Sequence, residues 1–218
     1  MAAIRNPLHF EIIPGILEKE SAEIEKKIEK VIQFAETIHI DLLDGKFADN
    51  TTFSDPSFFK RFTKDAKFEV HMMVENPQQY LKTWADAGFG RFIGQIEKMP
   101  NIEEFVAEGQ MLGEIGLAVD IETPVEKILR YTEDLDFAFV MTVKAGFSNQ
   151  SFDPRMLEKI GELRQKDELL PIEVDGGVNE EDITALKDAG ATRFVSTGTI
   201  FGSENLKDEY GRLKNLLV

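Results

Sequence analysis

Short apolar runs recur along the whole chain, and longer stretches with a helical spacing of apolar residues separate them. Parallel strands that are buried on both faces have continuous hydrophobic sequences, so this alternation predicts βα units around a parallel sheet. Eight runs are expected to form strands: Glu11–Ile13, Thr37–Leu42, Phe68–Met72, Arg91–Ile96, Gly116–Val119, Phe137–Thr142, Ile172–Val174 and Arg193–Ser196.

The segments between these runs have the spacing of amphipathic helices. Two of them end in Ala-Gly, at Gly88 and Gly190, where glycine can adopt the left-handed conformation that closes a helix. The predicted helices are Ser21–Ala35, Ser57–Phe62, Pro77–Ala87, Ile102–Leu112, Pro124–Leu129, Pro154–Arg164, Glu180–Ala189 and Leu206–Leu217.

This alternation predicts the fold class. Eight strands and eight helices indicate an α/β protein with a single (β/α)8 TIM barrel domain over residues 1–218. A doubly wound open sheet is the alternative, because it has the same alternation of strands and helices.

Composition and charge narrow the class of protein. The 218 residues include 25 Lys and Arg, 40 Asp and Glu and no Cys, for a net charge of −15. Without cysteine there is no disulfide or thiolate chemistry, and a metal must be bound by His, Asp or Glu. The negative charge argues against nucleic acid and anionic membranes, and no signal-peptide or membrane-spanning run occurs. We therefore expect a soluble, cytoplasmic globular protein.

Candidate chemistry lies at the ends of the predicted strands, where the active sites of such barrels are found. His39 and His71, two of the three histidines, fall in predicted strands, and Asp41 and Asp175 lie near strand ends. His39 and Asp41 are two residues apart, so both side chains point to the same side. Two imidazoles and two carboxylates at one rim can bind Zn²⁺, Fe²⁺, Mn²⁺ or Co²⁺ with one position left open.

Each of these residues has a simpler explanation when it is taken alone. A histidine at a strand end is usually a hydrogen-bonded core residue, and an Asp-Gly pair is usually a tight turn. A buried, ionised carboxylate, however, costs several kcal/mol unless it is paired or bound to a metal. The four residues together therefore favour a functional site, whereas His9, before the first strand, is expected on the surface.

Glycine-containing loops predict a phosphate site. Gly176 and Gly177 follow the seventh predicted strand, and residues 196–199 (STGT) follow the eighth. In (β/α)8 barrels these two loops and a nearby helix N-terminus commonly bind phosphate through backbone N–H groups. The loop at residues 143–150 is long enough to act as a lid or clamp.

Four segments together resemble the motifs of the ribulose-phosphate 3-epimerase family: HIDLLDGKF at residues 39–47, VHMMVENP at 70–77, GF with QSF within 146–152, and EVDGGV at 173–178. Their order and spacing agree with the family over essentially the whole chain. The resemblance implies an enzyme of the pentose phosphate pathway that uses one divalent metal ion, Zn, Fe, Mn or Co. It would interconvert D-ribulose 5-phosphate and D-xylulose 5-phosphate.

The resemblance also implies roles for individual residues. His39, Asp41, His71 and Asp175 would bind the metal, and Asp41 and Asp175 would be the acid and base on opposite faces of the substrate. Met72 and Met73 would line the cavity, although filling the core explains these methionines equally well. Substrate and phosphate contacts would come from His71, Gly146, Phe147, Ser148, Asn149, Gly176, Gly177, Thr197 and Gly198.

Several positions depart from the family pattern, while all four metal positions are retained. The departures leave two alternatives open: an epimerase for another ketose phosphate, such as a hexulose 6-phosphate, or a non-catalytic barrel that binds a sugar phosphate. They are Gly15 for the usual serine, Gln95 for a common histidine, Lys144-Ala145 for Asn-Pro, Ser148-Asn149 for a glycine pair, and Thr197-Gly198 for Gly-Ser.

Two further expectations concern related enzymes and assembly. A decarboxylase of the orotidine monophosphate type is disfavoured, because no lysine lies between Asp41 and Asp44. A homo-oligomer is expected, with the apolar residues near Phe53, Phe58 and Phe59 as a possible subunit contact.

Overall fold

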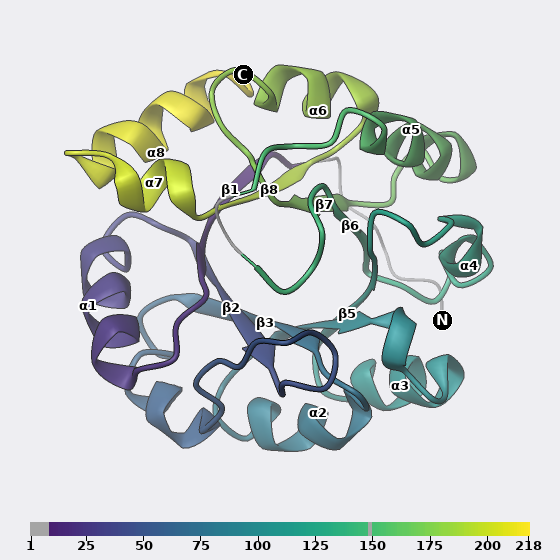
Figure 1. Cartoon of the computed structure of the whole chain (residues 1–218), viewed down its shortest axis with the longest axis horizontal. Helices are drawn as coiled ribbons and strands as arrows, with labels where there is room; N and C mark the ends of the chain where they lie inside the picture. Colours follow the sequence, from purple (N-terminus) through teal and green to yellow (C-terminus); the bar gives the residue numbers. More distant parts are fainter. Residues whose placement is uncertain (1–8, 148–149) are drawn as a thin grey trace.

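A computed structural model describes residues 9–147 and 150–218 and shows eight parallel strands in a closed barrel (Figure 1). Each strand pairs with its neighbours in sequence, and the last strand closes the ring by pairing with the first. The closed ring confirms the predicted (β/α)8 barrel and excludes the open sheet. The strands are β1 (Glu11–Ile16), β2 (Thr37–Leu43), β3 (Lys67–Met73), β4 (Arg91–Gln95), β5 (Glu114–Val119), β6 (Phe137–Met141), β7 (Ile172–Asp175) and β8 (Arg193–Ser196).

Helices surround the barrel as an outer ring (Figure 1). None of the helices within the described ranges is long and apolar enough to cross a membrane. A short helix that the sequence did not predict, α7 (Gly198–Gly202), directly follows β8. The others are α1 (Ser21–Val31), α2 (Gln78–Ala85), α3 (Ile102–Gly109), α4 (Glu126–Leu129), α5 (Met156–Lys166), α6 (Ile183–Ala189), α8 (Leu206–Asn215) and the 3-10 helices η1 (Pro56–Arg61) and η2 (Ile96–Lys98).

The alternation of side chains along each strand divides the core into two layers. Side chains such as Ile38 and Ile40 point outward and pack in the layer between strands and helices. Side chains such as Ile13, Phe139 and Val195 point into the barrel and form a separate, smaller cluster. Side chains two residues apart on a strand therefore share one layer.

Helix ends follow the local hydrogen bonding. Helix α1 ends at Val31 rather than at Ala35, because the chain there tightens into turns in which the Phe34 N–H donates to the Val31 carbonyl over 3.0 Å. Gly88 and Gly190 have φ angles of 98° and 119°, as the Ala-Gly pairs predicted.

The aromatic residues that suggested a subunit contact lie mostly inside the molecule. Phe59 is fully buried, with ring centroids 5.5 Å from Trp84 and 5.4 Å from Phe89. Phe53 and Phe58 are half-buried and pack against Phe59. Phe59 is therefore not a surface residue of this chain, and the homo-oligomer stays a prediction.

Candidate active site

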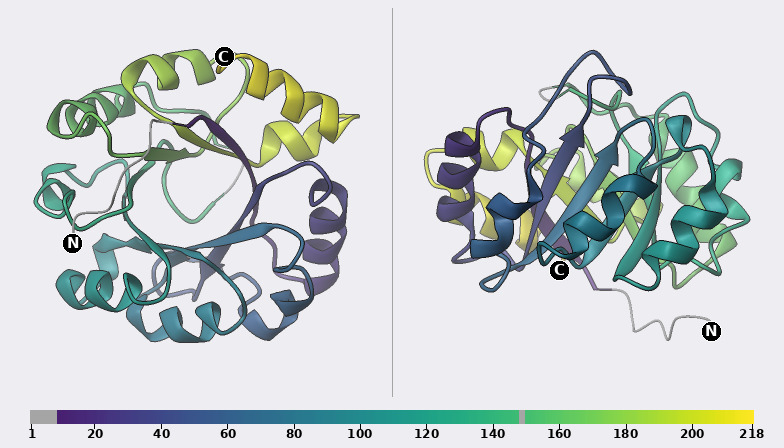
Figure 2. Two further views of the ribbon diagram at one scale, coloured as in Figure 1. Left: turned by 180° about the vertical axis from the view of Figure 1, so that it is seen from behind. Right: turned by 90° about the horizontal axis from the view of Figure 1, so that it is seen from below.

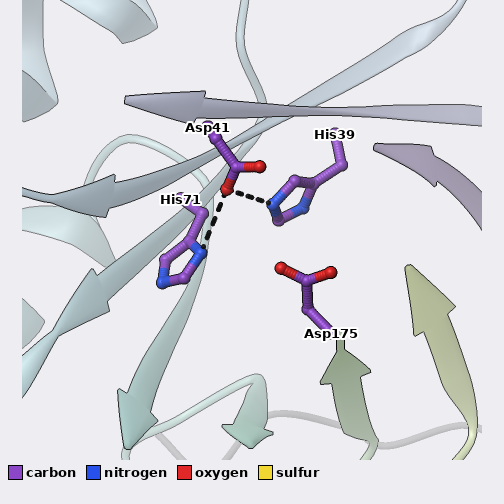
Figure 3. A group of neighbouring side chains, drawn as sticks. All are labelled: His39, Asp41, His71 and Asp175. Carbon is purple, nitrogen blue, oxygen red and sulfur yellow. Dashed lines mark hydrogen bonds and ion pairs between the residues drawn. The ribbon is translucent and has the colours of Figure 1, made fainter. Parts of the chain in front are cut away.

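Side chains from three strands meet at one end of the barrel. The strand arrows run together toward this end (Figure 2, right). The pairing of β2 with β3 places Asp41 level with His71, and the pairing of β6 with β7 places Asp175 level with Met141. Asp175 points from β7 toward the two histidines and Asp41 (Figure 3). The structure thus brings together the four residues that the sequence singled out.

A single carboxylate oxygen lies between the two imidazoles. Asp41 Oδ1 is 3.2 Å from His39 Nε2 and 3.3 Å from His71 Nδ1 (Figure 3). Both histidines are completely buried and Asp41 is 4% exposed. Water therefore has little access to the ring atoms that face this carboxylate.

Outer hydrogen bonds determine which ring nitrogen faces Asp41. His39 Nδ1 lies 2.7 Å from Glu69 Oε1, and His71 Nε2 lies 2.6 Å from Gln95 Oε1. Carboxylate and amide oxygens accept hydrogen bonds, so each of these nitrogens carries the proton. The opposite nitrogen of each ring faces Asp41 and, once it carries no proton of its own, can bind a cation.

Charged residues fill the barrel on the amino-terminal side of this layer. Arg91 Nη1 lies 2.5 Å from Glu69 Oε2 and 3.8 Å from Glu173 Oε2, and Arg193 Nη1 lies 3.9 Å from the same Glu173 oxygen. Both guanidinium groups lie over the Phe137 ring, with 5.6 Å and 4.9 Å to its centroid. Burial and the neighbouring Glu69 carboxylate raise the pKa of Glu173 well above its usual value. The two arginines lower this pKa but do not outweigh the rise.

Sequence reasoning did not identify this charged layer or the role of Gln95. A usable signal exists for two of its members, because Glu69 and Glu173 precede His71 and Asp175 by two residues and so must face the same side. Oxygens of these two glutamates also lie within 4.8 Å of a nitrogen of His39. The Arg91 guanidinium already neutralises that group, so we do not assign a second cation to it.

The two aspartates have opposite pKa shifts. Burial alone would raise the pKa of Asp41, but the imidazoles of His39 and His71 outweigh it and lower the value to about 2. Burial and the Asp41 carboxylate raise the pKa of Asp175 to about 6. For His39, burial is outweighed by Asp41 and Glu69, so its pKa lies well above the usual range.

The four central residues fit a divalent cation. One donor atom from each of His39, Asp41, His71 and Asp175 lies within 4.8 Å of the others. Among the described residues, the buried Nδ1 atom of His71 has no hydrogen-bond partner. A buried imidazole nitrogen and a carboxylate that face each other are held together by a proton or by a cation, and nitrogen and oxygen donors suit Zn²⁺ and its neighbours.

A cavity of ≈ 550 Å³ opens at this end of the barrel. Asp41 and Asp175 belong to its wall together with Leu17 and Val195. Of the other residues predicted from the sequence, the wall includes Met73, Gly146, Phe147, Gly176, Gly177, Thr197 and Gly198.

Two predicted contacts within the described residues, Met72 and His71, are not part of this wall. Met72 packs in the outer layer, because it alternates with His71 and Met73 along β3, so its prediction as a cavity residue is wrong. His71 is completely buried beside Asp41 and is not among the residues that line the cavity. Ser148 and Asn149 lie outside the described residues.

The loops after β7 and β8 are tied together beside the cavity. Ser196 Oγ and Thr199 Oγ1 both donate to the Val178 carbonyl, over 3.0 Å and 2.8 Å. Gly176 and Gly177 have φ angles of 116° and 65°, which a side chain rarely tolerates. Gly176, Gly177 and Gly198 line the cavity where the sequence predicted a phosphate site, and α7 begins at Gly198.

Fold and site together define the class of protein, a (β/α)8-barrel enzyme with paired carboxylates at its strand ends. The sequence profile described as "Ribulose-phosphate 3 epimerase family" matches residues 11–201. The chain therefore belongs to the ribulose-phosphate 3-epimerase family and is an isomerase of the epimerase type.

Curated relatives cover nearly the whole chain. Ribulose-phosphate 3-epimerase of Schizosaccharomyces pombe is 33% identical over 95% of this chain and 93% of that protein. The Bacillus subtilis protein of the same name is 32% identical over 94% of this chain and 98% of its own. The cytoplasmic isoform of Oryza sativa subsp. japonica is 34% identical over 88% of this chain and 87% of its own.

Solved structures with the same fold are more distant in sequence. A 3-hexulose-6-phosphate synthase is 15% identical with a TM-score of 0.71, over 95% of this chain and 100% of that one. Orotidine 5'-phosphate decarboxylase from Pyrococcus horikoshii OT3 is 14% identical with a TM-score of 0.69, over 94% of this chain and 98% of that one. At this identity the likeness shows the shared barrel fold alone.

Proposed function

We propose that this chain interconverts D-ribulose 5-phosphate and D-xylulose 5-phosphate by exchanging the proton at C3. The observation that carries this proposal is the pair of carboxylates, Asp41 on β2 and Asp175 on β7, which reach one cavity from different strands (Figure 3). Inversion at a carbon needs one group that removes a proton from one face and another that returns a proton to the opposite face.

A divalent cation held by His39, Asp41, His71 and Asp175 completes the proposed site. When bound, it would supply Lewis-acid stabilisation of the negative charge that develops next to C3. Glu69 and Gln95 would keep the two imidazoles in the orientation that this role needs, because they hold the far nitrogen of each ring. Zn, Fe, Mn and Co all suit this donor set.

The proton transfer follows from the two carboxylates. A C3 proton beside the ketone is weakly acidic, and one carboxylate takes it while the electrons of the C–H bond form the enediolate. The other carboxyl group gives a proton to the opposite face of C3, and the two groups exchange roles in the reverse direction. In the chain without metal the pKa of Asp41 is lowered to about 2 and that of Asp175 is raised to about 6, so the two carboxylates differ in proton affinity, as an acid and a base must.

The remaining substrate atoms would be held by the loops beside the cavity. Backbone N–H groups of the loops after β7 and β8 would bind the phosphate, so the net charge of −15 does not prevent an anionic substrate from binding. Phe147, which is 44% exposed on the loop after β6, would cover the sugar. A cytoplasmic location and the exclusion of nucleic acid as a partner stay predictions.

Isotope exchange tests the proposal directly. The metal-loaded protein is incubated with D-ribulose 5-phosphate in deuterated water, and a second sample is treated first with a chelator. We expect D-xylulose 5-phosphate with deuterium at C3 in the first sample and loss of both in the second. Deuterium-free substrate without product in the first sample would contradict the proposal.

The same assay separates the alternatives. Exchange with a hexulose 6-phosphate but not with D-ribulose 5-phosphate would indicate an epimerase for another ketose phosphate. Binding of a pentose phosphate without any exchange would indicate a non-catalytic barrel.

A further inference from the structure

Gly15 and Thr197 compete for one space in the wall of the cavity. A Cβ atom added to Gly15 would overlap the Thr197 hydroxyl oxygen and would lie 2.8 Å from Val195 Cγ1. Gly15 is a strand residue, and its φ angle is not in the left-handed region, so its backbone does not require glycine. The packing around Gly15 does require glycine, because a close-packed wall cannot hold both a side chain at position 15 and the side chain of Thr197.

This space belongs to the proposed active site. Gly15 pairs with His39 across β1 and β2, and the residues on either side of it in the inward-facing row, Ile13 and Leu17, pack in the inner cluster. Thr197 lines the same cavity as Asp41. The hydroxyl of Thr197 therefore lies on the wall that a sugar in this cavity would contact.

The Thr197 hydroxyl is also free to bind a ligand. A threonine that directly precedes a helix usually caps it by accepting a backbone N–H bond, but Thr197 makes no such bond with α7. Among the described residues it has no other hydrogen-bond partner. Its neighbours Ser196 and Thr199 use their hydroxyls to hold the Val178 carbonyl, so the loop does not need a third one.

We propose that Thr197 donates a hydrogen bond to a hydroxyl or carbonyl oxygen of the sugar, and that Gly15 is required because it leaves room for that side chain. The resemblance to the family shows the reverse arrangement, with serine usual at position 15 and glycine usual at position 197. Relative to the family pattern, which has serine at positions 15 and 198, this chain has glycine at both positions and carries a hydroxyl at position 197. The inference rests on the proposed function, because it needs a ketose phosphate in the cavity.

Side-chain replacements at Thr197 test the contact. Thr197→Val keeps the shape and removes the hydroxyl, and we expect kcat/KM for D-ribulose 5-phosphate to fall by about five- to tenfold. The dissociation constant of a pentitol 5-phosphate, which cannot react, should rise by a similar factor in calorimetry. Thr197→Ser should recover most of this loss. Thr83→Val, at an exposed site on α2, is the matched control and should change neither value.

A double-mutant cycle tests the coupling. Gly15→Ser alone should lower Tm by about 5 °C and weaken binding of the pentitol phosphate, because the new side chain meets Thr197. Adding Thr197→Gly should restore part of the Tm and part of the affinity. The recovery should be incomplete, because the Cγ1 methyl group of Val195 must still move. Equal effects of Gly15→Ser in both backgrounds would overturn the coupling.

The outcomes distinguish this inference from the proposed function. If the wild-type chain epimerises and Thr197→Val matches it in kcat/KM and in affinity, the inference alone is wrong. If the wild-type chain binds the pentitol phosphate without epimerising any substrate, the proposed function is wrong and the affinities still decide the role of Thr197. If it neither binds nor reacts, both are wrong.

Discussion

Replacing Gln95 by methionine tests the hydrogen bond that orients His71. The substitution keeps the length of the side chain and removes the oxygen that lies 2.6 Å from His71 Nε2. Both residues are completely buried, so water cannot replace the lost partner. Loss of such a supporting partner lowers metal affinity about 10- to 100-fold, which is about 1.4–2.7 kcal/mol of binding free energy.

The stability of the metal-free protein should change much less, because two effects oppose each other. The Nε2–H group of His71 loses its acceptor, which costs about 1–3 kcal/mol in a buried site. The Gln95 amide nitrogen, which is buried without a hydrogen-bond partner among the described residues, is removed by the same substitution and offsets that cost. We therefore expect the free energy of unfolding to change by no more than about 1 kcal/mol.

Two measurements separate metal binding from stability. Zn²⁺ or Co²⁺ is titrated in competition with a chelator of known affinity, and urea unfolding is followed without metal. Gln79→Met, on the exposed side of α2, is the matched control. Equal metal affinity in Gln95→Met and the wild type would refute the reasoning. A large loss of metal-free stability with unchanged affinity would show that the hydrogen bond serves only the fold.

Three other predictions follow from single residues. Asp175→Asn should lower kcat at least a hundredfold while circular dichroism shows a folded protein, because an amide cannot carry the proton, and retained turnover would contradict its role. Without metal, the contribution of Asp175 to stability should fall as pH rises from about 4 to about 6, because its pKa is about 6 in the folded chain and the unfolded chain, near 3.8, releases this proton first. Asp175→Asn lacks this contribution, so its Tm should rise relative to the wild type across that interval, and parallel curves would speak against the shift. Gly88→Ala should lower stability by about 1–3 kcal/mol, because φ is 98° and its Cβ would lie 2.8 Å from Thr63 Cβ, whereas Gly161→Ala, in an open position on α5, should raise it by about 0.5–1 kcal/mol in urea unfolding.

The sequence predicted the barrel and the central group of the site because both depend on short-range regularities. Buried strands alternate with amphipathic helices, and the two-residue repeat along β2 puts His39 and Asp41 in the interior. The same repeat decides between Met72 and Met73, which the sequence treated alike although only Met73 reaches the cavity. Helix α7 was missed because five residues are too few to show a helical period.

The charged layer could not be predicted in the same way, because its partners come from distant strands. Arg91 pairs with Glu69 from 22 residues away, and Arg193 pairs with Glu114 across 79 residues. Charged side chains at the start of a strand usually indicate solvent, since burial of an unpaired charge is costly. Only the closed barrel shows that these charges neutralise one another inside it.

The hydrogen bonds from Glu69 and Gln95 have a consequence for how this protein can change. The atoms that orient His39 and His71 lie in completely buried side chains that do not line the cavity, whereas the cavity wall is built largely from loop residues. Substitutions in the loop part of the wall, which excludes Asp41 and Asp175, can therefore alter which sugar phosphate is accepted without loosening the proposed metal ligands. Binding of the proposed metal and choice of substrate are then separable traits, which laboratory selection could adjust one at a time.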